Sequence, residues 1–331
     1  MILQTLRTPD ERRALAHAPA LPPFDASQLA DHQPDLHLCA VSDAAVVEAH
    51  ASLWWTHVPR CDAHRVAVIG HYASASDEAA AFLLAAALHD LQDRACTLAI
   101  GPMDGNTWRR YRFVVDPGSE PPFFLEPANS PAWPLQWQSA GFTPHAHYVS
   151  TLNADLRQTD SRVSRVAERM DRLGVRIRTA RLPELLSDLV RIYRLSQVAF
   201  ARNLLYTDLS QADYLTQYEK IVPHIQPELL LLAERGGDLV GFVFAIPDRA
   251  QAARGRPIDT FLLKTVAILP DPALAGLGAL MAESVQQEGH RLGFRRCIHA
   301  LMYEKNVSLN TSLRYGSVMR RYALFSRELP R

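Results

Sequence analysis

The chain has 331 residues, of which 48% are hydrophobic and 21% charged, and these shares are typical of folded globular proteins and exclude a disordered or fibrous chain. Its 35 basic and 35 acidic residues balance, so no global positive field attracts nucleic acid or an anionic membrane. The length is about twice that of a usual domain of roughly 150 residues, which predicts two domains.

The cysteines and the apolar stretches indicate a compartment. Cys39, Cys61, Cys96 and Cys297 lack any Cys-x-x-Cys spacing, which predicts reduced thiols and no structural metal site. The first residues lack the apolar core of a signal peptide. The most apolar stretch, 79–88, is about half of the ~20 residues that a membrane-spanning helix requires. We therefore expect a cytoplasmic protein with no membrane partner and no metal.

The first half of the chain combines strand patterns with one helix. Period-two alternation predicts a hairpin, and an apolar-faced stretch that begins at Asp77 predicts a helix between two further strands. Proline makes one region too irregular for secondary structure, and a closing strand follows it. In chain order these are strands 35–41, 46–55 and 65–72, helix 77–93, strand 96–101, the proline-rich region 117–134 and strand 141–151.

The second half repeats this order after an amphipathic helix and a short strand. Gly236 and Gly237 set a hairpin turn. The expected elements are helix 155–173, strand 175–179, helices 183–200 and 210–221, hairpin 228–234/239–247, strand 261–269, helix 274–292, strand 297–302, helix 308–315 and strand 319–327. Both halves share a β-β-β-α-β centre, which favours a structural duplication over one large sheet. We place the domains at 1–153 and 154–331.

Two glycines, Gly276 and Gly278, lie between strand 261–269 and the next helix. Glycines at such a turn let the backbone approach an anion closely, and the unpaired amides at the start of the helix then bind it. The pattern is that of a phosphate site. The alternative is that the glycines only permit close packing of the helix on the strand.

The residues around this turn resemble the motifs of the GNAT superfamily of N-acetyltransferases. The resemblance rests on the strand Val266-Ala267-Ile268-Leu269-Pro270, the turn Ala273-Leu274-Ala275-Gly276-Leu277-Gly278, and Asn306-Val307-Ser308-Leu309-Asn310 with Gly316. It implies an α+β (mixed α/β) fold of two tandem GNAT-like domains, each a mixed, mostly antiparallel sheet flanked by helices. It is strongest over 228–329. The N-terminal half resembles a degenerate domain, because its counterpart loop, 73–77, has no glycine and ends in an acid that repels pyrophosphate.

The resemblance also implies the co-substrate, acetyl-CoA (acyl-CoA), used without a metal. The pantetheine arm would pair with the backbone of the strand, the pyrophosphate would rest on amides of the turn, and an asparagine would contact the arm. The residues implied for these roles are Val266, Ala267 and Ile268, then Ala275, Gly276, Leu277, Gly278 and Ala279, and finally Asn306. Two positions depart from the family: Ala273 replaces a basic residue, and Ser312 stands where a tyrosine acid is usual.

The chemistry of the family is direct attack of an amine on the thioester, which requires a base for the amine and an acid for the leaving thiolate. We expect the catalytic residues among Glu304, Tyr303 and Ser312. Asp259 and His299 are further candidate bases, and Tyr315 is a further candidate acid. Each candidate has a structural alternative, as a loop acid, a strand histidine or a packed aromatic ring.

Three residues are candidates for binding the acceptor. Trp108 and Arg109 belong to a loop that gathers turn residues, an aromatic ring and three arginines, a composition that suits an anionic or aromatic ligand. The alternative is that Trp108 packs between the domains and the arginines face solvent. Lys264 would hold a substrate carboxylate if it points into the cleft, or it would reach solvent at the sheet edge.

We therefore expect an N-acetyltransferase that moves an acetyl (acyl) group to a primary amine of a small molecule, amino acid or peptide. One alternative is a non-catalytic acyl-CoA-binding protein, suggested by Ala273 and Ser312. Another is an aminoacyl-tRNA-dependent transferase, suggested only by the arginine-rich loop that holds Trp108. The balanced charge argues against a nucleic-acid partner, and a homodimer stays open.

Overall fold

The computed structural model describes residues 1–61, 63–219 and 221–330. Across these residues, 14 strands form one hydrogen-bonded sheet. The strands lie in the order β1-β3-β4-β5-β6-β14-β8-β13-β12-β11-β10-β9, and β2 and β7 pair off this path with β4 and β14. No helix in the described ranges is long and apolar enough to cross a membrane.

The first half of the chain supplies eight of these strands and four helices, within 1–61 and 63–153. In chain order they are β1 (Ile2–Leu6), α1 (Pro9–Arg13), β2 (Ala16–His17), α2 (Gln28–His32), β3 (Leu36–Val41), β4 (Val46–Trp54), β5 (Val66–Ser74), α3 (Asp77–Asp93), β6 (Leu98–Gly101), β7 (Phe113–Asp116), α4 (Ala132–Ser139) and β8 (Thr143–Asn153). Ser76 caps α3, because its hydroxyl accepts a hydrogen bond from the amide of Ala79.

The second half supplies the remaining strands, within 154–219 and 221–330. In chain order its elements are α5 (Ser161–Arg172), β9 (Val175–Thr179), η1 (Leu182–Glu184), α6 (Leu185–Ala199), α7 (Gln211–Glu219), η2 (Val222–His224), η3 (Pro227–Leu229), β10 (Leu230–Arg235), β11 (Asp238–Pro247), α8 (Arg249–Ala253), β12 (Thr260–Ile268), η4 (Pro272–Leu274), α9 (Leu277–Arg291), β13 (Arg296–Tyr303), α10 (Val307–Ser312) and β14 (Ser317–Glu328). The expected hairpin turn is confirmed, since Gly236 and Gly237 both have positive φ.

The two halves repeat one topology. Four antiparallel-paired strands, β1-β3-β4-β5 in the first half and β9-β10-β11-β12 in the second, each lead through a helix to a parallel partner, β6 or β13. The helices are α3 and α9. This agrees with the expected duplication and with the mixed, mostly antiparallel sheets.

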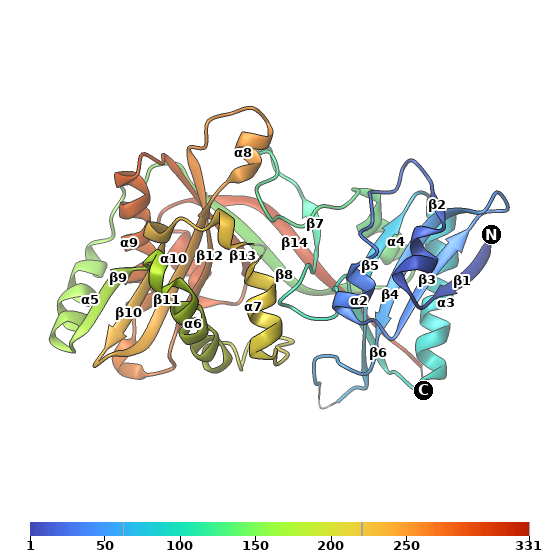
Figure 1. The fold of residues 1–331 in the computed structure, drawn as a ribbon, viewed down its shortest axis with the longest axis horizontal. Coiled ribbons are helices and arrows are strands. Elements are labelled where there is room, and N and C mark those ends of the chain that lie inside the picture. Colours follow the sequence, from blue (N-terminus) through green and yellow to red (C-terminus); the bar gives the residue numbers. More distant parts are fainter. Residues whose placement is uncertain (62, 220, 331) are drawn as a thin grey trace.

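The halves also exchange their last strands, which the sequence does not reveal. β8 ends the first half but pairs with β13 of the second, and β14 ends the second half but pairs with β6 of the first. The two exchanged strands pair with each other at the centre, where Figure 1 shows β8 and β14 running between the two lobes. The expectation of two separate sheets is therefore wrong, because this exchange makes the sheet continuous. The boundary after Asn153 stays a prediction.

The helices cover both faces of the second half. α9 packs against β11 and β12 on one face, in a core that holds Leu277, Met281 and Phe261. α6 and α7 cover the opposite face with Leu189, Ile192 and Tyr214. Each face of β12 is therefore buried, which explains why its sequence is an almost continuous apolar run.

Some local expectations need correction. Region 117–134 is not wholly irregular, because α4 begins at Ala132. The strand β7, which ends just before this region, was not expected. The helix expected over 155–173 begins only at Ser161, where the side chain of Asp160 caps the amide of Arg162. The helix expected over 274–292 begins later, at Leu277, because the residues up to Leu274 belong to the separate 3-10 helix η4. The short elements before residue 35, which are β1, α1, β2 and α2, show no clear hydrophobic periodicity, so the sequence did not predict them.

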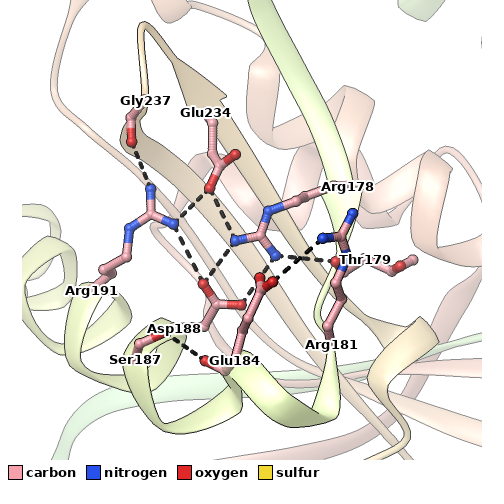
Figure 2. A network of polar contacts seen from close by, with 9 residues as sticks. All are labelled: Arg178, Thr179, Arg181, Glu184, Ser187, Asp188, Arg191, Glu234 and Gly237. Atoms are coloured by element: carbon pink, nitrogen blue, oxygen red, sulfur yellow. Dashed lines mark hydrogen bonds and ion pairs between the residues drawn. The ribbon is translucent and has the colours of Figure 1, made fainter.

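A network of charged side chains fastens α6 to the edge of the sheet (Figure 2). Arg178 of β9 donates to Asp188 of α6 at 2.8 Å and to Glu234 of β10 at 3.1 Å. Arg191 of α6 donates to Glu234 at 2.6 Å and to the carbonyl of Gly237 at 2.9 Å. Two cations balance two carboxylates, and Asp188 is buried. This network holds the helical layer against the sheet and leaves no surplus charge for a ligand.

Candidate functional site

The parallel strands β12 and β13 separate part-way along their length. Their pairing begins at Thr260 and Arg296 and ends at Leu263 and His299. Beyond that point β13 continues beside β8, while Val266, Ala267 and Ile268 of β12 pair only with β11. A one-residue bulge at Lys264 accompanies the separation. The three residues predicted to pair with an extended ligand thus lie on a strand with one unpaired edge.

The glycine turn lies at the end of this edge. Gly276 has φ of 84° and forms the N-cap of α9, a backbone conformation that favours glycine. No side chain caps the helix, and the amides of Leu277 and Gly278 have no intrahelical acceptor, whereas the amide of Ala279 donates to the carbonyl of Gly276 at 3.0 Å. A Cβ at Gly278 would meet Ile268 and Val266 at 3.6 Å, an ordinary contact. Close packing therefore does not explain Gly278, and the phosphate interpretation gains support.

Helix α5 borders the same turn. A Cβ at Gly276 would lie 3.0 Å from Val166. The guanidinium of Arg169 donates to the carbonyl of Ala275 and is exposed to solvent. Arg169 therefore places a cation beside the turn whose own first position, Ala273, lacks one.

His299 and Ser312 form a buried pair at the point where the strands separate. The Nδ1 atom of His299 lies 2.5 Å from the hydroxyl of Ser312, which is the last residue of α10. That hydroxyl also donates to the sulfur of Met302 at 3.1 Å. Both side chains are buried, and burial lowers the pKa of His299 to about 4, so the imidazole is neutral near pH 7.

Comparisons with known proteins were made at the level of sequence and of structure. No family model matches the sequence, and no curated protein matches it significantly. Solved structures do match. A GCN5-related N-acetyltransferase from Anabaena variabilis aligns with a TM-score of 0.57 at 9% identity, covering 99% of this chain and 73% of that one. The chain has the GNAT fold.

Two further solved structures align with most of this chain. A GCN5-related N-acetyltransferase from Sphaerobacter thermophilus aligns with a TM-score of 0.51 at 15% identity, covering 89% of this chain and 81% of that one. A tandem GNAT protein from the clavulanic acid biosynthesis pathway aligns with a TM-score of 0.50 at 14% identity, covering 100% and 99% of the two chains. The expected GNAT fold is therefore confirmed, with its mixed sheet flanked by helices.

Lys264 lies at the bulge of β12, in the second GNAT half. Burial and, to a smaller extent, the nearby cation of Arg112 lower its pKa to about 8, against the opposing effect of Glu126. Arg112 reaches this point from the first half: it donates to the carbonyl of Leu301 at 2.8 Å and lies over the rings of Tyr111 and Tyr148. Sequence reasoning missed Arg112, because nothing along the chain places it beside β13.

The other predicted catalytic residues lie near the exchanged strands. Glu304 forms an ion pair with Arg321 at 3.0 Å and is partly exposed. The ring of Tyr303 packs against that of Tyr148 at 5.4 Å. These contacts leave the predicted roles of Glu304 and Tyr303 as predictions. Asp259 is less suited, because it precedes the start of β12 and accepts hydrogen bonds from Gln251 and Thr260.

Asn306 and Tyr315 both have structural partners. The side chain of Asn306 caps α10 by accepting from the amide of Ser308 at 3.1 Å. The hydroxyl of Tyr315 donates to Glu283 at 2.6 Å, and burial raises the pKa of this buried tyrosine. Tyr315 thus supports α9 rather than facing the separated strands. Ser312, a predicted catalytic residue that stands where a tyrosine acid is usual, contacts His299 at the separation.

The predicted acceptor residues Trp108 and Arg109 face the interior of the protein. The indole of Trp108 donates to the carbonyl of Thr207 at 2.9 Å and contacts the rings of Phe200, Tyr206 and Tyr214. Arg109 donates to the carbonyls of Asp31, His32 and Asp104. The contacts of Trp108 match the alternative in which it packs between the two halves, whereas the carbonyl partners of Arg109 differ from the solvent-facing arginines of that alternative. Their role in binding an acceptor stays a prediction.

The corresponding separation in the first GNAT half is occupied by its own chain. β5 and β6 pair as far as Val68 and Ile100. Beyond them, the amide of Met103 donates to the carbonyl of Ile69 at 2.9 Å, and Asp104 accepts from the amide of His71 at 2.6 Å. A Cβ at Gly70 would lie 2.0 Å from the carbonyl oxygen of Met103. The chain itself thus takes the place of a ligand arm, in agreement with the degenerate domain that the loop composition implies.

Proposed function

We propose that this protein is an N-acetyltransferase that transfers the acetyl group of acetyl-CoA to a primary amine of a small molecule, an amino acid or a peptide. The observation that carries the proposal is the separation of β12 from β13 beyond Leu263 and His299, with the glycine turn at its end. An extended arm pairs with the free edge of Val266, Ala267 and Ile268. The pyrophosphate binds the first-turn amides of α9, beside the cation of Arg169.

The direction of the bound arm follows from these two anchors. With its phosphate end at Gly276, the arm points its thioester toward the bulge at Lys264, where the strands meet. An amine that reaches this point attacks the thioester carbon directly. The amide groups of the bulge are suited to bind the oxygen that becomes negative in the transition state. No covalent intermediate on the protein is required.

Calorimetric titration with acetyl-CoA and with CoA tests this proposal. Wild-type protein should bind both in the micromolar range, and Gly276→Glu should abolish binding because its carboxylate blocks and repels the pyrophosphate. Gly293→Glu is the matched control: Gly293 follows the other end of α9, has φ of 94° and has no neighbouring heavy atom within 4 Å of an added Cβ. Both substitutions place a side chain at a positive φ, but only Gly276→Glu lies at the turn, where its Cβ would also meet Val166 at 3.0 Å.

The outcome separates the candidate functions. Binding lost in Gly276→Glu and kept in Gly293→Glu supports the site and justifies a screen of primary amines that monitors release of the CoA thiol. Binding without turnover of any amine would favour the non-catalytic acyl-CoA-binding alternative. Absence of binding to wild-type protein would overturn the proposal.

A further inference from the structure

Side chains become accessible on both strands where β12 and β13 separate. The last paired residues, 261–263 and 297–299, are buried, whereas residues 264–266 of β12 and 301–303 of β13 are partly exposed. Lys264 is the first residue of β12 beyond the last pair, and the bulge leaves it without a partner on β11. Its side chain therefore begins at the apex of the opening and is within reach of a ligand.

In the described part of the chain, no carboxylate forms an ion pair with Lys264. The acid whose charge acts on this ammonium is Glu126. Both oxygens of Glu126 already have partners, because one accepts from the guanidinium of Arg320 and the other from the hydroxyl of Tyr322. The side chains of Glu126 and Arg320 are 2% and 4% exposed, so this ion pair is closed to solvent. Arg320 therefore neutralises Glu126, and Lys264 keeps its charge without a counter-ion.

The guanidinium of Arg112 brings a second cation to the same opening. It is buried, and it donates to the carbonyl of Leu301, on the separated part of β13, at 2.8 Å. Its Cζ atom lies 3.6 and 4.1 Å from the ring centroids of Tyr111 and Tyr148, contacts that stabilise the charge in part. Its Nε atom has no hydrogen-bond partner, and no carboxylate pairs with it, within the ranges that the structure describes.

The two cations act on one space. The charge of Arg112 lowers the pKa of Lys264, so the two side chains are close enough to repel each other. Positive charges that are held away from bulk water need a counter-ion, and the described residues supply none for this pair. The apex of the opening is therefore suited to a ligand that carries negative charge.

We propose that the acceptor is an amino acid whose free carboxylate binds the ammonium of Lys264, with the charge of Arg112 strengthening the attraction. This inference rests on the proposed function, in which the arm bound at Gly276 points its thioester toward the bulge at Lys264. The amine must come within about 3.5 Å of the thioester carbon to attack it. A carboxylate that reaches Lys264 at the same time is only a few bonds from that amine. An amino acid meets this condition, whereas a polyamine has no carboxylate and the terminal carboxylate of a peptide lies far from its amino end.

Matched acceptors test the carboxylate. Each of the protein-forming amino acids is compared with its own amide by release of the CoA thiol. The amine of the amide is the weaker base and is less protonated at neutral pH, so without a carboxylate site the amide would react faster. We expect the acid to have the higher kcat/KM by about 10- to 100-fold, the range given by one charge-assisted hydrogen bond.

Substitution of Lys264 tests the residue. Lys264→Met keeps the length of the side chain and removes the charge. It should raise the KM for the preferred amino acid about tenfold or more, with little change in kcat, in the KM for the matching amide or in the affinity for acetyl-CoA. Lys264→Arg keeps the charge and should keep the preference for the acid. Lys305→Met, at an exposed lysine after β13, is the matched control and should behave as wild type.

Lys264 also reports a bound carboxylate without turnover. A bound anion covers the amine and raises its pKa, and both effects slow its reaction with an amine-labelling reagent. With CoA present, the preferred amino acid should slow the labelling of Lys264 about tenfold, the effect of one pKa unit, while its amide leaves the rate unchanged. Lys305, followed in the same mass spectra, corrects for reagent consumed by the free amines.

The results distinguish failure of this inference from failure of the proposed function. If wild-type protein does not bind acetyl-CoA, the proposed function fails and this inference fails with it. If acetyl-CoA binds and amines are acetylated, but amides react as well as acids or Lys264→Met keeps the preference for acids, the function stands and the inference is overturned. If acetyl-CoA binds and no amine is acetylated, the labelling decides: absence of protection by every amino acid overturns the inference.

Discussion

The two halves of this protein separate a parallel strand pair at the same place in their topology, but different groups occupy the two separations. In the first half, Met103 and Asp104 bond to the backbone of Ile69 and His71. In the second half, Val266 to Ile268 keep a free edge beyond the last pair. The same scaffold therefore yields a closed structural unit in one case and an open strand edge in the other. A short connecting segment decides between them.

The two bulges also differ in their charge environment. His71, at the bulge of β5, lies in a buried group of polar rings: it contacts Ser52 and His32 at 2.8 Å each, and Ser52 contacts His37 at 2.8 Å. Burial lowers the pKa of His71 to about 3, so this histidine is neutral in the folded protein near pH 7. Lys264, at the bulge of β12, is an amine with a pKa of about 8. The closed half therefore holds a neutral histidine at this position, whereas the open half holds an ionisable amine.

The largest expected effect concerns the closed separation. Gly70→Ala should lower the free energy of unfolding by about 3 kcal/mol, because its Cβ would lie 2.0 Å from a backbone carbonyl that cannot move cheaply. The matched change in the open half, Gly278→Ala, should be neutral or should raise the free energy of unfolding by up to about 1 kcal/mol, since its Cβ makes ordinary contacts and alanine favours a helix more than glycine does. Urea unfolding of both variants measures the difference. Equal costs would show that the first separation is not filled as described.

A smaller effect is expected from acid. His71 titrates near 6.5 in the unfolded chain and near 3 in the folded protein, so only the unfolded chain binds the proton between these values. Stability should therefore be fully present above pH 6.5 and fall as the pH drops, by about 2 kcal/mol for this residue at pH 5. His37 and His50, whose pKa values burial also lowers, add to the same loss.

His71→Asn isolates the contribution of this histidine, because asparagine tolerates the positive φ of 45° and does not titrate. Denaturant unfolding at pH 7, 6 and 5 should show a shallower decline in the variant than in wild type. A decline of the same steepness would assign the acid sensitivity to other groups.

The smallest effect concerns charge across the two halves. Arg112→Met removes a cation near Lys264 and should raise the pKa of that amine, by up to about one unit, while burial keeps it below 10.5. Lysine is rare enough in this chain, at Lys220, Lys264 and Lys305, for each amine to be followed separately. The pH dependence of amine labelling, read by mass spectrometry, gives the pKa. An unchanged value would mean that Arg112 does not act on Lys264.

Much of the candidate site could be predicted because it lies in one continuous segment. Strand 261–269, the turn with Gly276 and the following helix are adjacent along the chain, so spacing alone places the turn between the strand and the helix start, while the family resemblance implied that the strand pairs with a ligand arm. The sequence predicted the members of the pair of His299 and Ser312 but not their contact. Both residues were candidates, but their 2.5 Å contact depends on how α10 folds back on β13. Hydrophobic periodicity and secondary-structure propensity carry no information about such a contact.

The sequence by itself determined the repeated order of strands and helices, the glycine turn and the absence of glycine in its counterpart loop. These follow from local physics: side-chain period, backbone freedom and capping act over a few residues. Only the tertiary structure decided that β8 and β14 change places, that Met103 and Asp104 close the first separation, and that Arg112 reaches the second. Those outcomes depend on hydrogen bonds between segments far apart in the chain, because a strand edge accepts any partner that the topology brings to it.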